Sequence, residues 1–187
     1  MNDHSVKAVS VKTVSAKAAS ASAPRWQSLP LFLLAAALVV IDQVSKLLAN
    51  TQLNYGEPTP VLPSFDLLLM YNRGAAFSFL NDAGGWQRWI LSGISLGVSL
   101  FLGLWLMRLP AQQKLLRWAV AVILGGALGN LYDRVAYGYV VDFISLYWRD
   151  WRFATFNIAD AAISVGAALL VLDVLLSRER NVEPGAK

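Results

Sequence analysis

Four long apolar stretches constrain the fold of this chain more than any other feature of its sequence. They run over about Leu29 to Leu48, Trp86 to Met107, Leu115 to Tyr132 and Asn157 to Leu176. Each is close to the roughly 20 residues that an α-helix needs to cross the hydrocarbon core of a bilayer. With 56% hydrophobic and 15% charged residues, the chain is also more apolar than an ordinary globular domain. The sequence therefore predicts an all-α membrane protein with four transmembrane helices.

The basic residues predict how these helices are oriented. An even number of spans places both termini on one side of the membrane. Ten Lys and Arg residues lie in the terminal segments and in the loop between the second and third stretches, against five in or beside the other two loops. Because Lys and Arg are enriched in cytoplasmic loops, both termini are expected to be cytoplasmic.

The chain divides simply along its length. Residues 1–28 combine four basic residues with an Ala, Ser and Val background and are expected to form a flexible cytoplasmic tail. Residues 29–176 are expected to form the transmembrane domain, with outer loops at 49–85 and 133–156. Residues 177–187 form a second cytoplasmic tail.

The two outer loops have the pattern of short strands. Val61 to Leu80 and Tyr137 to Phe156 alternate apolar and polar residues and carry Pro or Gly near their starts. Trp148 and Trp151 give the second loop the composition of an interfacial aromatic belt. A small β-rich extracytoplasmic portion is therefore expected on the outer membrane surface.

The composition excludes several classes of catalytic site. The chain has no cysteine, and its one histidine, His4, lies in the polar N-terminal segment. Disulfides, thiolate catalysis, zinc sites and Ser-His triads are therefore not expected, and no metal or other cofactor is predicted. The net charge of +4 comes from basic residues spread over loops and tails, so nucleic acid is not an expected partner.

Acidic residues interrupt three of the apolar stretches at one depth. At a rise of about 1.5 Å per residue, Asp42 lies roughly 20 Å along the first span and Asp133 roughly 27 Å along the third. The fourth span runs inward, so Asp160 near its start reaches the same level. A charge inside hydrocarbon costs roughly 2.5 to 3.5 kcal/mol on insertion scales, so several at one depth indicate a polar site.

Some polar residues at this depth have both a structural and a functional interpretation. Asp42 and Lys46 are spaced i, i+4, as in an ordinary helix ion pair, so they either support the site or contact a substrate. Support is favoured. Asp133 and Arg134 fit a structural ion pair, and this role is slightly favoured for Asp133. Asn130, on the same face as Asp133, fits either role equally.

Small residues mark two places of close approach. Gly125 and Gly129, four apart on the third span, fit close helix packing in a membrane. Asn72 begins a run of small residues that reaches Ala75 and Ala76. That run fits either a tight turn or a backbone that approaches a ligand, with Asn72 orienting a substrate peptide bond.

Asp142 and Asp160 form the most informative acidic pair. Asn157 and Asp160 fit a helix N-cap followed by an acidic third residue, and Asp142 in an apolar strand fits a solvated carboxylate. Together, however, two carboxyls in a low-dielectric site can split their titrations, so that one holds a proton while the other acts as a base. Such a pair activates water and protonates a leaving amine without Ser, Cys, His or a metal.

Five motifs together resemble those of one family. They are Asp42-Gln-Val-Ser-Lys46, Asn72-Arg-Gly-Ala-Ala-Phe77, Gly125-Gly-Ala-Leu-Gly-Asn130-Leu-Tyr-Asp-Arg134, Val140-Val-Asp-Phe143 and Phe156-Asn-Ile-Ala-Asp160. In this order, on a chain with four predicted spans, they resemble the lipoprotein signal peptidase family, also called signal peptidase II. The resemblance covers about Leu29 to Leu176.

The resemblance implies an aspartyl endopeptidase of the bacterial inner membrane, with its site near the periplasmic face. It implies cleavage of signal peptides from prolipoproteins just before a diacylglyceryl-modified cysteine, with membrane lipids as surroundings and the cyclic peptide globomycin as an inhibitor. By motif position, Asp142 and Asp160 match the catalytic dyad. Positions that contact substrate are matched by Asn72, Gly126, Asn130, Arg134 and Asn157. Supporting positions are matched by Asp42, Lys46 and Asp133.

Two other classes of protein fit four spans with intramembrane acids. A small proton-coupled transporter is the first, but it requires polar groups through the inner halves of the spans, where Leu31 to Val40 and Ala167 to Leu172 contain none. The second is a structural membrane subunit in which polar residues hold the helices together. The stability of variants of the two acids distinguishes this class from an enzyme.

Overall fold

The computed structural model of the protein describes residues 25–74 and 85–182. Its long helices are α1 (Leu29–Gln52), α2 (Gln87–Arg108), α3 (Lys114–Ala136) and α4 (Ile158–Val182). All four are long and apolar enough to cross a membrane, which confirms the four predicted spans. Three of them continue several residues past the predicted ends, because hydropathy marks only the part of a helix that lies in hydrocarbon.

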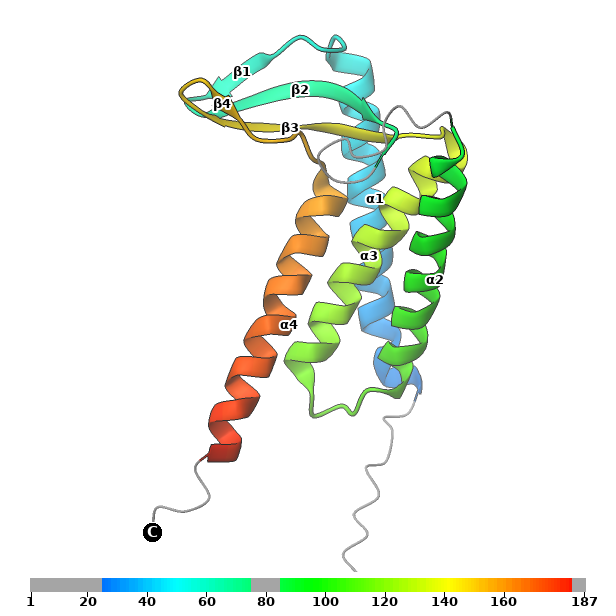
Figure 1. The fold of residues 1–187 in the computed structure, drawn as a ribbon. Helices are drawn as coiled ribbons and strands as arrows, with labels where there is room; N and C mark the ends of the chain where they lie inside the picture. The colour runs from blue at the N-terminus through cyan, green and yellow to red at the C-terminus, as the bar shows by residue number, and fades with distance from the viewer. Residues whose placement is uncertain (1–24, 75–84, 183–187) are drawn as a thin grey trace, which may run out of the picture.

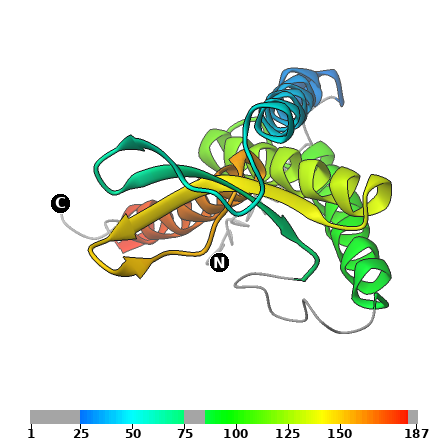
Figure 2. The same cartoon turned by 90° about the horizontal axis from the view of Figure 1, so that it is seen from above.

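Helix α3 is the centre of the bundle and packs against the other three (Figure 2). Small residues allow these contacts. A Cβ at Gly125 would lie 2.9 Å from the Cβ of Leu38 on α1, and one at Gly129 would lie 2.7 Å from a carboxylate oxygen of Asp42. The close packing predicted for both glycines is therefore confirmed, and it fits the role of small residues between membrane helices.

The outward faces of the helices are apolar. Large hydrophobic side chains that are more than half exposed include Leu33, Leu47, Ile94, Phe101, Trp118 and Leu175. Water would disfavour so large an exposed apolar surface, whereas lipid tails would not. The bundle therefore has the surface of a membrane domain.

A four-stranded antiparallel sheet lies across one end of the bundle (Figure 1). Its strands, in spatial order, are β1 (Thr59–Leu62), β2 (Phe65–Asn72), β3 (Val140–Trp148) and β4 (Trp151–Arg152). The short strands predicted in both outer loops are confirmed where the structure describes these loops. The part of the first loop from residue 75 to 84 lies outside the described residues. The first turn of α1 and the last of α4 lie at the opposite end of the bundle.

The register of the sheet brings two predicted site residues together. Met70 on β2 lies opposite Asp142 on β3, and Asn72 lies opposite Val140. Directly opposed residues share a face of a sheet, so Asn72 and Asp142 are diagonal neighbours on one face. An irregularity between Leu67 and Met70 sets this register.

The end of α3 is fastened just below the sheet. Arg88 on α2 donates from Nε to the backbone oxygen of Arg134 at 2.8 Å and from Nη2 to that of Val135 at 2.6 Å. A cation is favoured at these carbonyls because they form the negative end of the helix dipole. Gly138 then turns the chain towards β3 with a φ of +83°, as glycine commonly does after a helix.

A short 3-10 helix, η1 (Arg25–Ser28), precedes α1. These residues were predicted to end the flexible tail, yet Ser28 is buried and donates to the backbone oxygen of Leu106. Arg117 donates to the backbone oxygen of Gln27 at 2.8 Å and to the hydroxyl of Ser28 at 3.1 Å. The rest of the predicted N-terminal tail, residues 1–24, and residues 183–187 lie outside the described residues.

Candidate active site

Helix α4 begins with a reciprocal pair of hydrogen bonds. The backbone N–H of Asp160 donates to Oδ1 of Asn157 at 2.9 Å, and the backbone N–H of Asn157 donates to Oδ2 of Asp160 at 3.3 Å. This capping box satisfies two amides that the start of a helix leaves free. It confirms the predicted N-cap and its acidic partner. The Asp160 carboxyl is thereby held at the first turn of α4, half-buried.

The amide of Asn157 also reaches β3. Its Nδ2 donates to Oδ1 of Asp142 at 2.7 Å, and Asn72 on β2 donates to the other oxygen at 3.3 Å. Asp142 is only 2% exposed, so these amides take the place of water around its carboxyl. Asn157 therefore bonds to both acids and couples strand β3 to the start of α4.

Burial, together with the negative charge of Asp160, raises the pKa of Asp142 from 3.8 to about 7. The hydrogen bonds from Asn157 and Asn72 act in the opposite direction, because they favour the ionised form. Near neutral pH, a large share of the molecules therefore carry a proton on Asp142.

This raised pKa predicts a pH-dependent effect of Asp142→Asn on stability. Because the folded-state pKa of Asp142 lies above the unfolded value of 3.8, its favourable contribution is complete below about pH 4 and is lost as the pH rises towards 7. The variant has no such loss. We expect its thermal midpoint in detergent to exceed that of the unmodified protein by on the order of 10 °C at pH 8, with little difference at pH 4. The same shift at both pH values would contradict the raised pKa.

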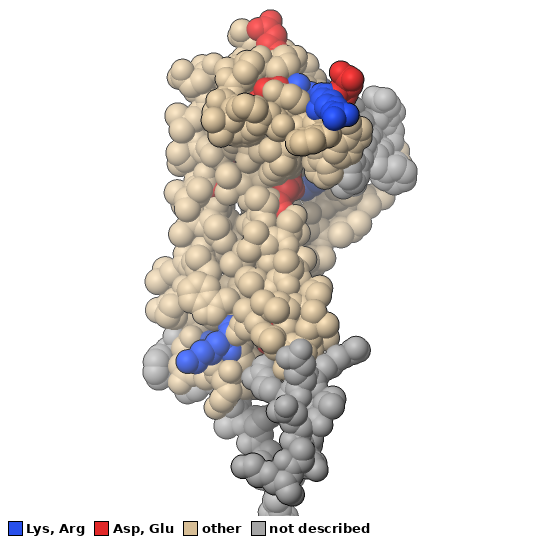
Figure 3. Space-filling model, turned by 90° about the vertical axis from the view of Figure 1, so that its left-hand side faces the viewer, with Lys and Arg blue, Asp and Glu red and all other residues tan. Residues whose placement is uncertain are grey.

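A cavity of about 580 Å³ lies beside the two acids, between the sheet and α4. Its polar wall is formed by Asn72, Arg134, Asp142, Thr155, Asp160 and Ser164. Its apolar wall is formed by Val140, Leu146, Phe153, Ala154, Phe156, Ala161, Ile163 and Val165. Acidic atoms are visible in the hollow beneath the sheet (Figure 3). Apolar walls with a few converging polar groups are typical of a binding site.

The residues predicted to contact substrate occupy different places around this cavity. Asn72 and Arg134 line it, and the Arg134 guanidinium lies within 3.5 Å of the backbone oxygen of Gly74. Asn130 and Asn157 contact the acids but do not line the cavity. Nδ2 of Asn130 donates to Oδ1 of Asp160 at 2.7 Å. Residues Ala75 to Phe77 of the motif that follows Asn72 lie outside the described residues.

Gly126 is placed between helices and not on the cavity wall. A Cβ at this position would overlap the backbone oxygen of Ala159 and would lie 2.8 Å from Cγ1 of Ile163, both on α4. The absence of a side chain therefore lets α4 approach α3 directly beside Asp160. Substrate contact by Gly126 stays a prediction.

The three predicted supporting residues form a buried ion cluster. The Lys46 ammonium lies 2.7 Å from Oδ2 of Asp42 and 2.9 Å from Oδ2 of Asp133. The expected i, i+4 ion pair is thus present, whereas the charged partner of Asp133 is Lys46 and not Arg134. These side chains are at most 3% exposed and do not line the cavity.

Sequence reasoning missed Gln43. Its Nε2 donates to Oδ1 of Asp133 at 2.8 Å and lies 3.2 Å from Oδ2 of Asp42 and 3.3 Å from the backbone oxygen of Gly129. The signal was available, because Gln43 is a polar residue at the same depth as Asp42 in an apolar span. Gln43 would have been a candidate if the depth of amide side chains, and not only of charged ones, had been considered.

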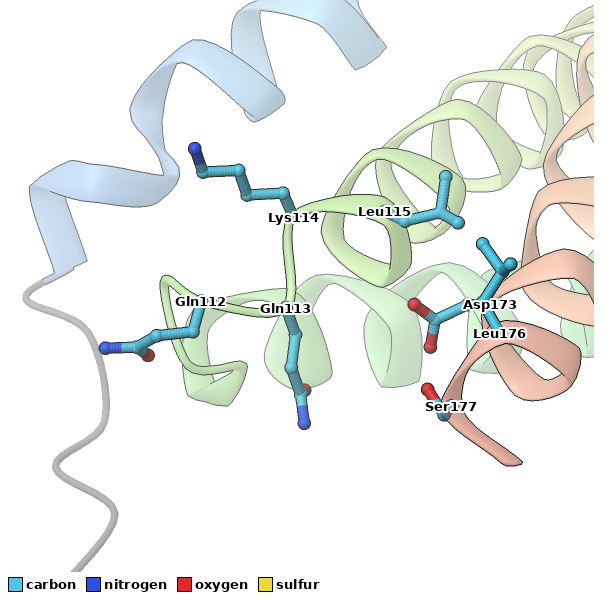
Figure 4. A pocket seen from close by; sticks show the side chains of 7 residues that line it. All are labelled: Gln112, Gln113, Lys114, Leu115, Asp173, Leu176 and Ser177. Carbon is cyan, nitrogen blue, oxygen red and sulfur yellow. The ribbon is translucent and has the colours of Figure 1, made fainter. Parts of the chain in front are cut away.

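A second cavity, of about 590 Å³, lies at the far end of the bundle between the start of α3 and the lower part of α4 (Figure 4). Asp173 is its one acid, with Gln113 and Ser177 nearby. A single acid cannot divide the roles of proton donor and base. Within residues 25–74 and 85–182, no group of three or more His, Cys, Asp or Glu residues is placed to hold a metal ion. The acid pair beneath the sheet is therefore the candidate active site.

Sequence comparisons agree on one family. The family model for signal peptidase (SPase) II matches residues 34–176. The lipoprotein signal peptidase of Acinetobacter baylyi is 48% identical over 80% of this chain and 84% of its own. That of Pseudoalteromonas translucida is 51% identical over 75% and 84%, and that of Shigella boydii 52% identical over 76% and 87%.

Solved structures share the fold. One bacterial membrane enzyme matches with a TM-score of 0.74 at 28% identity, covering 84% of this chain and 94% of the other. A second bacterial membrane enzyme matches with a TM-score of 0.67 at 29% identity, covering 78% and 92%. The four-helix bundle with its sheet is therefore shared with known membrane enzymes.

Proposed function

The chain belongs to the signal peptidase II family, a family of membrane-embedded proteases, and on that premise we propose that it is an aspartyl endopeptidase with Asp142 and Asp160 as its dyad. Its substrates are bacterial prolipoproteins whose cysteine already carries diacylglycerol, and it cuts just before that cysteine. The proposal is supported above all by Asn157, which bonds to both acids at the wall of one cavity.

The raised pKa of Asp142 supports a general acid–base mechanism in which Asp142 is the acid. Asp160 acts as the base and takes a proton from a water molecule, whose oxygen attacks the scissile carbonyl carbon. Asp142 gives its proton to the carbonyl oxygen, which forms a neutral tetrahedral diol. Asp160 then passes its proton to the amide nitrogen as the carbon–nitrogen bond breaks, and a diol hydroxyl returns a proton to Asp142. Both carboxyls end in their starting states.

The cavity walls support the choice of substrate. The apolar side chains suit the hydrophobic part of a signal peptide and the acyl chains of its lipid, which enter from the surrounding membrane lipids. Arg134 and Asn72 are the cavity-lining groups best placed to bond to the substrate backbone. Asn130 and Asn157 orient the acids from behind, and Gly126 sets the spacing of α3 and α4.

The charge distribution supports one membrane orientation. Lys and Arg are concentrated at the termini and in the α2–α3 loop, which supports a cytoplasmic position for this end of the bundle. The sheet and the dyad then face the periplasm of a bacterial inner membrane. A signal peptide inserted with its basic end inside would present its cleavage site at this level.

A cleavage assay tests the proposal directly. Purified protein in detergent is mixed with a prolipoprotein peptide that carries diacylglycerol on its cysteine, and the products are identified by mass spectrometry. We expect the released signal peptide and a fragment that begins with the lipidated cysteine. The same peptide without the lipid is the matched control. An intact lipidated peptide after prolonged incubation would overturn the proposal.

The pH dependence of cleavage tests the assignment of Asp142 as the acid. Its pKa of about 7 predicts that kcat/KM falls above about pH 7, because the proton donor is lost. Initial rates between about pH 5 and pH 9 check this, with the folded state monitored at each pH. A rate that stays constant to pH 9 would assign the donor role elsewhere.

Globomycin is expected to occupy the same cavity and block the dyad. It should raise the apparent KM of the lipidated peptide without changing kcat, because inhibitor and substrate compete for one site.

The comparisons give no support to the proton-coupled transporter. Helix α1 also supports the protease, since its inner half from Leu31 to Val40 contains no polar residue.

A further inference from the structure

Lys46 lies at the centre of the buried network behind the proposed dyad. Its ammonium group has three hydrogens, and three acceptors surround it: Oδ2 of Asp42 at 2.7 Å, Oδ2 of Asp133 at 2.9 Å and Oδ1 of Asn130 at 3.1 Å. Lys46 is 2% exposed, so these contacts replace its hydration. Every hydrogen of the ammonium group therefore has a partner on the protein.

The two carboxylates of this network hold the backbone just ahead of the proposed catalytic acids. Oδ1 of Asp42 accepts from the backbone N–H of Ala159 at 2.9 Å, and Oδ2 of Asp133 accepts from that of Val141 at 3.1 Å. Ala159 and Val141 each immediately precede one acid of the dyad. Through its bonds to both carboxylates, the ammonium group links the start of α4 to strand β3.

Lys46 is also one of three groups that fix which way the Asn130 amide faces. Oδ1 of Asn130 accepts from Lys46 at 3.1 Å and from Nδ2 of Asn157 at 3.2 Å, while its Nδ2 donates to Asp160 at 2.7 Å. A flipped amide would place its hydrogens against two other donors and its oxygen against a carboxylate. Only one orientation satisfies all three contacts.

We propose that Lys46 is a positioning residue for the dyad, acting through the orientation of the Asn130 amide and not only through its charge. With this amide fixed, its hydrogens point at Asp160 and stabilise the carboxylate that accepts the proton of the attacking water. Lys46 itself touches neither substrate nor water. The inference rests on the proposed function, because it assigns a role within that reaction.

Charged groups surround Asp160 from each neighbouring element, and any pH effect has to be separated from theirs. They are Arg134 and Asp133 on α3, Asp42 and Lys46 on α1, and Asp142 on β3. The Lys46 charge lowers the pKa of Asp142, so removal of that charge alone should raise this pKa. Loss of the Asn130 hydrogen bond acts on the alignment of the Asp160 carboxyl and should lower kcat. The upper limb of the pH profile and the value of kcat therefore separate the two effects.

Lys46→Met removes both the charge and the donor. We expect kcat to fall about 100-fold with KM within about twofold, since the reacting groups lose their alignment while the cavity wall is unchanged. The upper limb of the pH profile should move to higher pH, because the Lys46 charge lowers the pKa of Asp142. A merely destabilised enzyme, measured below its unfolding midpoint, would keep that limb in place.

The double variant Lys46→Met/Asp42→Asn separates orientation from charge. It removes one positive and one negative group, so the net charge of the cluster is unchanged. The Asn side chain of the Asp42→Asn change can still accept the Ala159 hydrogen bond. We expect the upper limb of the pH profile to return to its original position, while kcat stays low.

Each outcome of these measurements either supports or contradicts the positioning role of Lys46. A double variant that recovers the original kcat as well as the original upper limb would overturn the positioning role and leave charge as the whole effect. A Lys46→Met variant with an unchanged profile would overturn it as well. If the unmodified protein fails to cleave the lipidated peptide, the proposed function itself is wrong. An active unmodified protein with unaffected variants rejects only the role of Lys46.

Discussion

Asp142→Asn and Asp160→Asn are each expected to reduce kcat for the lipidated peptide by about 1,000-fold or more. Either change leaves one carboxyl in a site whose chemistry needs a proton donor and a proton acceptor. General acid–base catalysis typically supplies 10²- to 10⁴-fold for each group, so loss of one group has an effect of this size. The measurement is the initial rate of signal-peptide release under saturating substrate. Asp150→Asn, at an exposed acid in the β3–β4 turn, is the matched control and should keep full activity.

The stability of the same variants separates an enzyme from a structural subunit. If the acids only hold helices together, both variants should lose thermal stability along with any other property of the protein. A catalytic dyad predicts the opposite for Asp142→Asn, which should be more stable than the unmodified protein at pH 8. Full cleavage activity in either variant would refute the dyad.

Gly126→Ala is expected to lower both stability and turnover. The new Cβ overlaps the backbone oxygen of Ala159, which cannot move without shifting α4. Overpacking of this kind costs typically 1 to 3 kcal/mol, or roughly 2–12 °C in the unfolding midpoint. Because Ala159 directly precedes Asp160, we also expect kcat to fall about 100-fold as the dyad loses its alignment. Thermal unfolding and cleavage rates of one preparation measure both effects.

Gly93→Ala is the control for this substitution. It makes the same chemical change in a membrane helix, but among the described residues no heavy atom beyond the adjacent residues and the backbone of this helix lies within 4 Å of the added carbon. Stability and turnover should therefore be nearly unchanged. A Gly126→Ala protein that keeps its unfolding midpoint and shows only a raised KM would favour the direct substrate contact implied by the family resemblance.

Much of this arrangement could be predicted from the sequence. Hydropathy and a fixed rise per residue were enough to bring Asp42, Asp133 and Asp160 to one level, and the structure places their helices in contact. The cap at Asn157 was also predictable, because it depends on neighbours three residues apart. These features are local, or they follow from depth alone.

The bonds between these residues were not predictable in the same way. The contact between Asn72 and Asp142 depends on a strand register set by an irregularity at Leu67 to Met70, which leaves no clear mark in the sequence. The pairing of Asp133 with Lys46 depends on which faces of α1 and α3 meet. The packing role of Gly126 became visible only with the backbone of α4 beside it.

The position of Asn157 restricts what chemistry its side chain may have. Ser, Thr and Asp begin helices about as well, since each offers an oxygen to the first free amide. None of them also has the amide nitrogen with which Asn157 bonds to Asp142 at 2.7 Å. An aspartate there would add a third carboxyl beside the pair, and a hydroxyl would be too short to serve both neighbours. The two bonds therefore require, at this one position, a single planar group that is donor at one end and acceptor at the other.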